Sequence, residues 1–423
     1  MNRVSDQGVA LDSRGAQNAF ALACFRAIGS ASAEDGPWAS VRDWNRAVQI
    51  LEIHGLLPML SLATDLPDAV QRLVLETKLR AATYQSNALD ALNGITREME
   101  ADGIPFAVLK GTYLYELLYR DLFPRAYGDI DLLVPADRIE DAVSALGRAG
   151  YDGDRKRVGR PAMPRWHFHA TLTASKPGGL PVELHRSLVD RANLYRVPEA
   201  ELFGRLLEFR ARQGGFTVLS TEDQWIYLCL HVAKHGTLNA IGLRNGFAPE
   251  WYCDPAAGNR LLWFLDIELF LQKYMDRLDW PSVAERMQRW NVVEEVIHCL
   301  GVIKVLQPES QAEHAMKHLG YRACETDSVW TAPAAVGGGG KPARRRGVLD
   351  RLLQSPFGQA LLARSMLVNP MYLIRPIRLF LLGQILAPSP TRLLRYHGKQ
   401  HRLWLPWLYL MHPFHMLHKT LLS

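Results

Sequence analysis

The sequence predicts an α+β fold, with a small mixed sheet flanked by helices, a helical N-terminal region and a helical C-terminal extension. Short apolar runs of strand length cluster in the middle of the chain, at residues 106–109, 129–134 and 182–185. Apolar residues at helical spacing dominate on both sides of them, at 67–101 and beyond residue 220. No run of about 18 uninterrupted apolar residues exists, so no transmembrane helix is predicted.

Composition sets the class of protein. The chain has 423 residues, 48% of them hydrophobic and 22% charged, which is typical of a folded protein of two or three domains. The five cysteines are scattered without a Cys-x-x-Cys pair, which disfavours a disulfide scaffold or a zinc ribbon. The first sixteen residues lack an apolar signal core. We therefore expect a cytoplasmic protein, with peripheral attachment at the inner membrane surface as the alternative.

Breaks in the pattern divide the chain into six segments. We expect a disordered N-terminus (1–20), a helical region that packs on the core (21–104), a catalytic core (105–215), a second helical domain (216–330), a flexible basic linker (331–346) and a basic amphipathic helical tail (347–423). Residues 67–101 predict one long helix or two, ended by Asp102-Gly103. Their predicted core stripe comprises Leu73, Leu75, Leu79, Ala82, Leu89, Leu92 and Ile95.

The first predicted strand of the core ends in Lys110-Gly111-Thr112, from which a helix runs to about Tyr119. A glycine there lets the backbone approach a ligand, and the free N–H groups at the start of a helix favour a phosphate. Lys110 is a candidate phosphate contact or an ordinary surface lysine at a strand end. Thr112 either caps the helix or binds a phosphate oxygen. The sequence leaves both pairs of alternatives open.

Three carboxylates follow in strand-like runs. Side chains alternate faces along a strand, so Asp129 and Asp131 point the same way. Two carboxylates on one face repel each other unless a cation lies between them, and magnesium is the expected cation. Residues 166–173 alternate like a strand, and a turn at 177–179 lets residues 182–185 pair antiparallel with them. This places Glu183 in a neighbouring strand as the third carboxylate.

These motifs resemble those of the bacterial uncharacterised nucleotidyltransferase family, within the DNA polymerase beta-like nucleotidyltransferase superfamily. The resemblance rests on Lys-Gly-Thr at 110–112, Arg125, Asp-Ile-Asp at 129–131 and Val-Glu-Leu-His at 182–185, in that order, and covers roughly residues 45–300. The spacer between Gly111 and Asp129 is longer than in compact members of the superfamily.

The resemblance implies a nucleotidyltransferase sheet and named site residues. Asp129, Asp131 and Glu183 would be catalytic and would bind two Mg²⁺ ions, with Mn²⁺ as an alternative. The nucleotide would be bound by Lys110, Gly111, Thr112, Arg125, His235 and Asp266. For Arg125, an ordinary loop salt bridge is the alternative.

A second helix begins at a capping box, Ser-Thr-Glu-Asp at 220–223, and runs to about His235. His231 and His235 are four residues apart and share a face, but zinc would need a third ligand, so the main alternative is a face packed on the core. The resemblance adds that His235, with Asp266 in Leu-Trp-Phe-Leu-Asp at 262–266, lines the nucleotide pocket. A buried Asp266 needs a polar partner in either case.

The expected reaction transfers a nucleoside monophosphate from an NTP donor to a hydroxyl of an unidentified small molecule, peptide or glycan, with release of pyrophosphate. The alternatives are a toxin-type enzyme that modifies tRNA and a non-catalytic scaffold of the same fold. Residues 341–423 hold thirteen Lys or Arg and one acid, a net charge of +12, whereas the whole chain carries +6. This basic tail, residues 344–423, suits an anionic membrane surface or an acidic partner, nucleic acid less well, or the chain's own acidic body.

Overall fold

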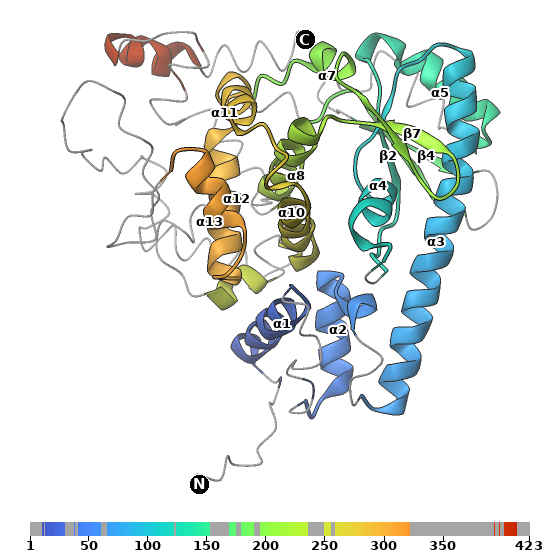
Figure 1. Cartoon of the computed structure of the whole chain (residues 1–423), viewed down its shortest axis with the longest axis vertical. Coiled ribbons are helices and arrows are strands. Elements are labelled where there is room, and N and C mark those ends of the chain that lie inside the picture. The colour runs from blue at the N-terminus through green and yellow to red at the C-terminus, as the bar shows by residue number, and fades with distance from the viewer. Residues whose placement is uncertain are drawn as a thin grey trace.

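The computed structural model describes residues 13–29, 41–60, 66–121, 124–152, 169–174, 179–189, 195–235, 249–254, 259–321 and 402–412, together with Leu11, Trp38, Leu393 and His397. Its centre is a seven-stranded mixed sheet in the order β3-β4-β5-β2-β1-β7-β6, with helices on both sides (Figure 1). The predicted fold class is confirmed. The central strand is β2, so its residues have neighbouring strands on both sides.

The sheet is built from short strands: β1 Ala107–Val108, β2 Ile130–Leu133, β3 Tyr151–Asp152, β4 His169–Ala174, β5 Val182–His185, β6 Leu207–Arg210 and β7 Gly215–Val218. β2 pairs parallel with β5 and antiparallel with β1, while β4 and β5 pair antiparallel, as predicted. Residues 166–168 of the predicted strand lie outside the described residues. The parallel pairing of β2 with β5 brings the two carboxylate motifs together.

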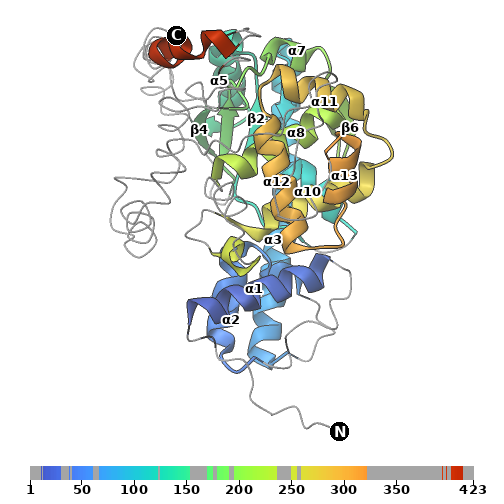
Figure 2. The ribbon, with the colours of Figure 1, turned by 90° about the vertical axis from the view of Figure 1, so that its left-hand side faces the viewer.

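The N-terminal region comprises α1 Arg14–Gly29, α2 Trp44–His54, η3 Leu57–Met59 and α3 Asp68–Ala101. Because α1 begins at Arg14, the expected disorder of residues 1–20 is wrong for residues 14–20. Phe20, Cys24 and Phe25 of this helix are buried. Apolar burial therefore orders a stretch whose polar beginning suggested disorder. Figure 2 shows α1 and α2 together at one end of the molecule.

Residues 68–101 form one uninterrupted helix, α3, but its buried face is not entirely the predicted one. Leu89, Leu92 and Ile95 are buried as predicted, whereas Leu75 and Leu79 are 45% and 59% exposed. The first half of α3 contacts the core through the face that carries Val70 and Val74. The assignment of Leu75, Leu79 and Ala82, which is also exposed, to the core is wrong because only one narrow face of this part of the helix is covered.

Between the first strands, α4 Thr112–Leu114 continues into a π-helical turn, η4 Tyr115–Tyr119, so the predicted helix is present. Next come η5 Ala136–Arg138, α5 Ile139–Arg148 and α7 Glu199–Phe203. The second helical region comprises α8 Thr221–His235, η6 Pro249–Cys253, α10 Leu261–Tyr274, α11 Trp280–Arg289, α12 Val293–Leu306 and α13 Ala312–His318. At the start of α8 the Asp223 backbone N–H donates to Ser220 Oγ, as the capping box predicts.

Buried apolar side chains from the N-terminal helices, the sheet and the second helical region form one continuous core. The predicted linker, residues 331–346, and most of the basic tail lie outside the described residues. Near the C-terminus, η8 Arg402–Trp404 leads into a helix at 405–412. None of the helices that the structure describes is both long and apolar enough to cross a membrane.

Candidate active site around Asp131

Asp131 and Glu183 lie side by side at the centre of the sheet. They are register partners in the parallel pair of β2 and β5. Asp131 is completely buried, while the Glu183 side chain is 27% exposed. The strand alternation that put Asp131 on a polar face of an apolar strand therefore also places it beside the third predicted carboxylate. The Asp131 carboxylate is enclosed by protein, whereas the Glu183 carboxylate is partly open to solvent and so accessible to a ligand.

Two basic side chains compensate the charge of Asp131. Lys110 Nζ lies 2.6 Å from Asp131 Oδ2, and His185 Nε2 lies 2.9 Å from Asp131 Oδ1. His185 Nε2 is also 3.6 Å from Glu183 Oε2. Burial alone would raise the pKa of Asp131, but the attraction of Lys110 and the hydrogen bond from His185 outweigh it and hold that pKa well below its usual range. Asp131 is an ionised carboxylate in the interior.

The same attraction acts on the two bases. Burial lowers the pKa of Lys110, but Asp131, Asp129 and Glu183 together reverse this and raise it. For His185, burial likewise lowers the pKa, and hydrogen bonds to Asp131 and Glu183 raise it above its ordinary value. Both bases therefore favour their charged forms. Lys110 was predicted as a site residue, whereas His185 was not, although it lies two residues after Glu183 and so on the same face of the strand.

Asp129 lies one residue before β2, partly exposed at the edge of this group. Burial and the repulsion of Asp131 raise its pKa, and Lys110 lowers it. Its carboxylate is not part of the group of ligand atoms that lie within 4.8 Å of one another, which comprises Asp131, Glu183 and His185. Among the described residues, the structure thus brings together two of the three predicted metal ligands and adds a histidine.

The Lys-Gly-Thr turn shapes this site through its backbone. Gly111 has φ +53°, and a Cβ there would lie 3.2 Å from the Asp129 carbonyl oxygen and 3.2 Å from the Tyr127 ring. Only glycine fits this close approach, which holds the loop before Asp129 against the turn. Thr112 is buried and its hydroxyl donates to the Tyr127 hydroxyl at 3.3 Å, while Gly111 occupies the N-cap position of α4. In this structure Thr112 supports the loop.

Arg125 and Asp266, both predicted to contact the nucleotide, bind each other. Arg125 donates from Nε and Nη2 to the two oxygens of Asp266, at 2.8 and 2.7 Å, and both residues are buried. The Tyr119 hydroxyl donates to Asp266 Oδ1 at 2.7 Å. The buried aspartate thus has the polar partners that its position requires. The pair ties the loop before β2 to helix α10 and so positions the strand that carries Asp131.

An aromatic group lies next to the carboxylates. The His231 and His235 rings pack 5.0 and 4.8 Å from the Trp263 ring, and Arg260 lies over the same indole at 5.9 Å. Burial lowers the pKa of His235 to about 3, helped by the nearby positive charges of Lys234 and Lys110. All three rings are partly exposed. The described residues hold no third metal ligand beside these two histidines. The two neutral imidazoles pack on Trp263 instead.

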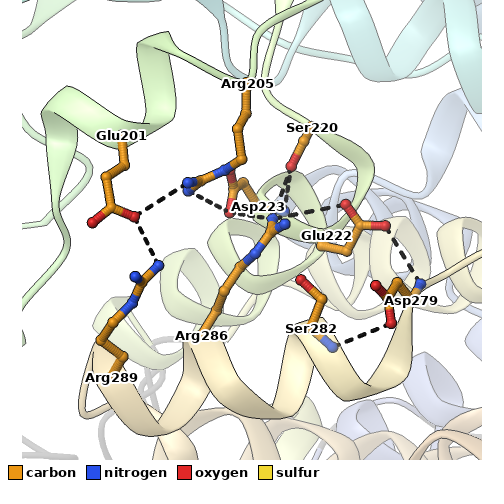
Figure 3. Close-up of polar contacts among 9 residues, drawn as sticks. All are labelled: Glu201, Arg205, Ser220, Glu222, Asp223, Asp279, Ser282, Arg286 and Arg289. Atoms are coloured by element: carbon orange, nitrogen blue, oxygen red, sulfur yellow. Dashed lines mark hydrogen bonds and ion pairs between the residues drawn. The ribbon is translucent and has the colours of Figure 1, made fainter.

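Helix α8, which carries both histidines, is fixed at its other end by the ion-pair network in Figure 3. Asp223 is fully buried there and accepts from Arg286 Nη1 at 2.7 Å and from Arg205 Nε at 3.0 Å.

Tyr227, in the middle of helix α8, lies near the carboxylates of the site. Burial and the negative charges of Asp131, Glu183 and Asp129 raise its pKa well above the usual range. The phenol therefore stays protonated beside the carboxylates.

Comparison with known proteins gives one match. The model of a family described as uncharacterised nucleotidyltransferase matches residues 40–308, more than half of the chain. The chain belongs to this family. Searches of curated proteins and of solved structures gave no match.

The nucleotidyltransferase match covers the whole site described above, from Lys110 after β1 to Asp266 on α10. The match also covers α8 and the ion-pair network around Asp223. The basic tail lies outside the match, so the family accounts for the sheet and the second helical region but not for residues 344–423. Membership of a nucleotidyltransferase family assigns the chain to nucleotidyl transfer as a class, and the group of acids with a histidine is compatible with that class.

Proposed function

We propose that the protein is a metal-dependent nucleotidyltransferase that transfers a nucleoside monophosphate from an NTP to a hydroxyl of a small molecule, peptide or glycan, with release of pyrophosphate. One observation carries this proposal. Asp131 and Glu183 are register partners on the central parallel strands, with His185 and Lys110 against the same carboxylate. Several charged side chains gathered at one point of a sheet are costly for stability, and such a group is typical of a site for phosphoryl transfer.

The residues fit a divalent cation. Asp131 and Glu183 offer two carboxylate oxygens, and His185, once a metal ion displaces its proton, an imidazole nitrogen; these three atoms lie within 4.8 Å of one another, and Asp129 at the edge offers another carboxylate. Oxygen ligands with phosphate suit Mg²⁺, and a nitrogen ligand also suits Mn²⁺. Two such ions, when bound, would neutralise the triphosphate and polarise the α-phosphorus toward attack.

The protein's own side chains have distinct roles in the proposed reaction. Lys110 brings a compact positive charge that a triphosphate can share with Asp131. Glu183, the partly exposed carboxylate, accepts the proton of the acceptor hydroxyl. Trp263 and His235 offer an uncharged aromatic surface for the base of the nucleotide. Arg125 and Asp266 act as positioning residues because each is bound by the other.

Thermal unfolding with Mg²⁺ and each nucleoside triphosphate in turn tests the proposal. A ligand at about 100 times its Kd stabilises the folded state by about 2.7 kcal/mol, so the correct donor raises Tm. We expect the rise to need Mg²⁺ and to disappear in Asp131→Asn and Glu183→Gln. Asp141→Asn, an exposed aspartate on α5 whose side chain is 56% accessible, is the matched control and keeps the rise.

Pyrophosphate release then separates an enzyme from a scaffold. The wild type, given the stabilising triphosphate and a mixture of hydroxyl-bearing metabolites and glycans, should release pyrophosphate, and Glu183→Gln should not. Stabilisation without release for any acceptor tried would point to a nucleotide-binding scaffold. Absence of stabilisation by every triphosphate, in a wild type with a normal cooperative transition, would contradict the proposed function.

A further inference from the structure

The C-terminal helix presents large apolar side chains to solvent. This segment, drawn red in Figures 1 and 2, consists of η8 Arg402–Trp404 and the helix at 405–412. Leu403 is 91% exposed, Leu410 60%, Trp407 56%, Trp404 45% and Met411 39%. Elsewhere in the described chain exposed apolar side chains of this size are few and scattered. A concentration of them in one short helix indicates a binding surface.

These side chains lie on one side of the helix. At about 100° per residue, the five positions fall within an arc of about 120°. The opposite side carries Leu408, which packs on Leu393, and His412, whose Nδ1 lies 3.2 Å from His397 Nε2. No residue from 403 to 412 carries a full charge. A surface helix ordinarily exposes a polar face, whereas this helix is largely apolar on both sides and leaves one apolar side exposed.

The surrounding sequence is strongly basic. The eleven residues 392–402 contain Arg392, Arg395, Lys399 and Arg402 without an acid, within a segment, 341–423, whose net charge is +12. Clusters of four or more Lys or Arg beside an apolar helix complement the negative potential of an anionic lipid surface. Tryptophan, which appears twice on the exposed face, favours the boundary between lipid headgroups and acyl chains.

We propose that the exposed face of residues 403–411 docks on an anionic lipid bilayer. The helix lies in the plane of the interface, since it is far shorter than the roughly 20 residues needed to cross. Leu403, Trp407 and Leu410 enter the acyl boundary, and the net positive charge of the surrounding sequence attracts the anionic headgroups. An RNA partner would need cations on the contacting face, and this face has none. The inference is independent of the proposed chemistry at Asp131.

Vesicle sedimentation of the full chain tests the proposal. Vesicles of phosphatidylcholine and phosphatidylglycerol in equal amounts should carry down most of the protein, and vesicles of phosphatidylcholine alone should carry down little. The variant Trp404→Ser/Trp407→Ser/Leu410→Ser should bind the anionic vesicles at least tenfold more weakly. The matched control is Leu75→Ser/Leu79→Ser, which removes exposed apolar side chains from α3 and should bind like the wild type.

Three results would overturn the proposal. The first is no preference for anionic vesicles at low salt. The second is equal binding by the wild type and the triple variant, which would place the contact on the basic residues alone. The third is loss of binding in both the triple variant and the control, which would make the effect unspecific. Quenching of tryptophan fluorescence by brominated lipid, present in the wild type and reduced in Trp404→Phe/Trp407→Phe, locates the contact independently of affinity.

Discussion

Two buried aspartates in this protein are compensated in different ways. Asp266 is matched one to one: Arg125 binds both of its oxygens and Tyr119 adds a hydroxyl. Asp131 is bound by Lys110 and His185, but Glu183 and Asp129 lie close enough to raise the pKa of Lys110 further. The first group has no excess charge for a ligand. Among the described residues, the second brings three carboxylates and two bases together, a grouping that a cation or a phosphate–metal complex can join.

The contrast distinguishes structural from functional burial of charge. A guanidinium fork that saturates both carboxylate oxygens fixes two segments, here the loop before β2 and helix α10. A lysine and a histidine each bind one oxygen of the Asp131 carboxylate, so either base can turn to a bound ligand without breaking a two-point contact. Breaking each group should therefore have different consequences: mainly for stability at Asp266, and mainly for ligand binding at Asp131.

The largest expected effect is the loss of stability in Asp266→Ala. Removing one partner of a buried pair leaves Arg125 charged and uncompensated, which costs about 3–5 kcal/mol. Urea unfolding should show this as a lower midpoint. Tyr119→Phe removes only the hydroxyl contact and should cost about 1 kcal/mol. A loss in Asp266→Ala no larger than that in Tyr119→Phe would show that the pair is not the structural clamp inferred here.

Two buried histidines also differ in whether an acid compensates them, and this difference should appear in how stability depends on pH. His185 has an acid partner and a raised pKa, whereas burial lowers the pKa of His54, which is 1% exposed, from 6.5 to about 4. Below pH 6.5 the unfolded chain takes up a proton at His54 and the folded chain does not, so stability falls as pH drops from 6.5 to 4. The expected contribution of His54 across this range is about 3 kcal/mol.

His54→Gln tests this linkage. The variant should lose part of its stability at pH 7, because glutamine does not fill the buried space of the imidazole in the same way. Its stability should nevertheless fall less steeply between pH 6.5 and 4 than that of the wild type. Urea unfolding at several pH values measures both slopes. Parallel slopes would show that His54 titrates normally in the folded protein. Ile53→Gln, at an exposed position of the same helix, is the control and should leave the wild-type slope unchanged.

A smaller effect is expected at the aromatic surface. Trp263→Leu keeps an apolar side chain but removes the face against which a base would stack, so NTP affinity should fall by about 1–2 kcal/mol, or roughly 5- to 30-fold. Calorimetric titration measures it. Inorganic tripolyphosphate, which has no base, should bind the variant and the wild type equally. An equal loss for both ligands would mean that Trp263 supports the phosphate side of the site instead.

Local patterns predicted the parts of the site that lie within single strands or turns. Alternation placed Asp131 on a polar face, and the turn at 177–179 allowed the antiparallel pair of β4 and β5. Alternation also held the signal for His185, two residues after Glu183, but only the pairing of β5 with β2 shows that it reaches Asp131. Local patterns could not predict contacts across long separations.

Arg125 and Asp266 show this limit, as do Leu75 and Leu79. The arginine and the aspartate are 141 residues apart, so each could be recognised only as a polar residue in need of a partner. Leu75 and Leu79 fit a helical stripe, but the fold covers only the neighbouring face of α3. Periodicity gives the faces of a helix, and tertiary packing decides how much of a face is buried.

The smallest expected effect is also the one that tests the central contrast most directly. Glu183→Gln removes one of three neighbouring carboxylates that repel one another, and burial together with this repulsion raises the pKa of Asp129. The metal-free protein should therefore become more stable by about 0.5–1 kcal/mol. Urea unfolding in the presence of a chelator measures this. The same variant should lose the Mg²⁺-dependent stabilisation by triphosphate.

Glu201→Gln is the matched control for this prediction. Glu201 binds Arg205 and Arg289 in a compensated network, so its loss should destabilise the protein slightly. If Glu183→Gln destabilised the metal-free protein as Glu201→Gln does, the acids around Asp131 would be balanced like those around Asp266, and the difference between the two groups would disappear.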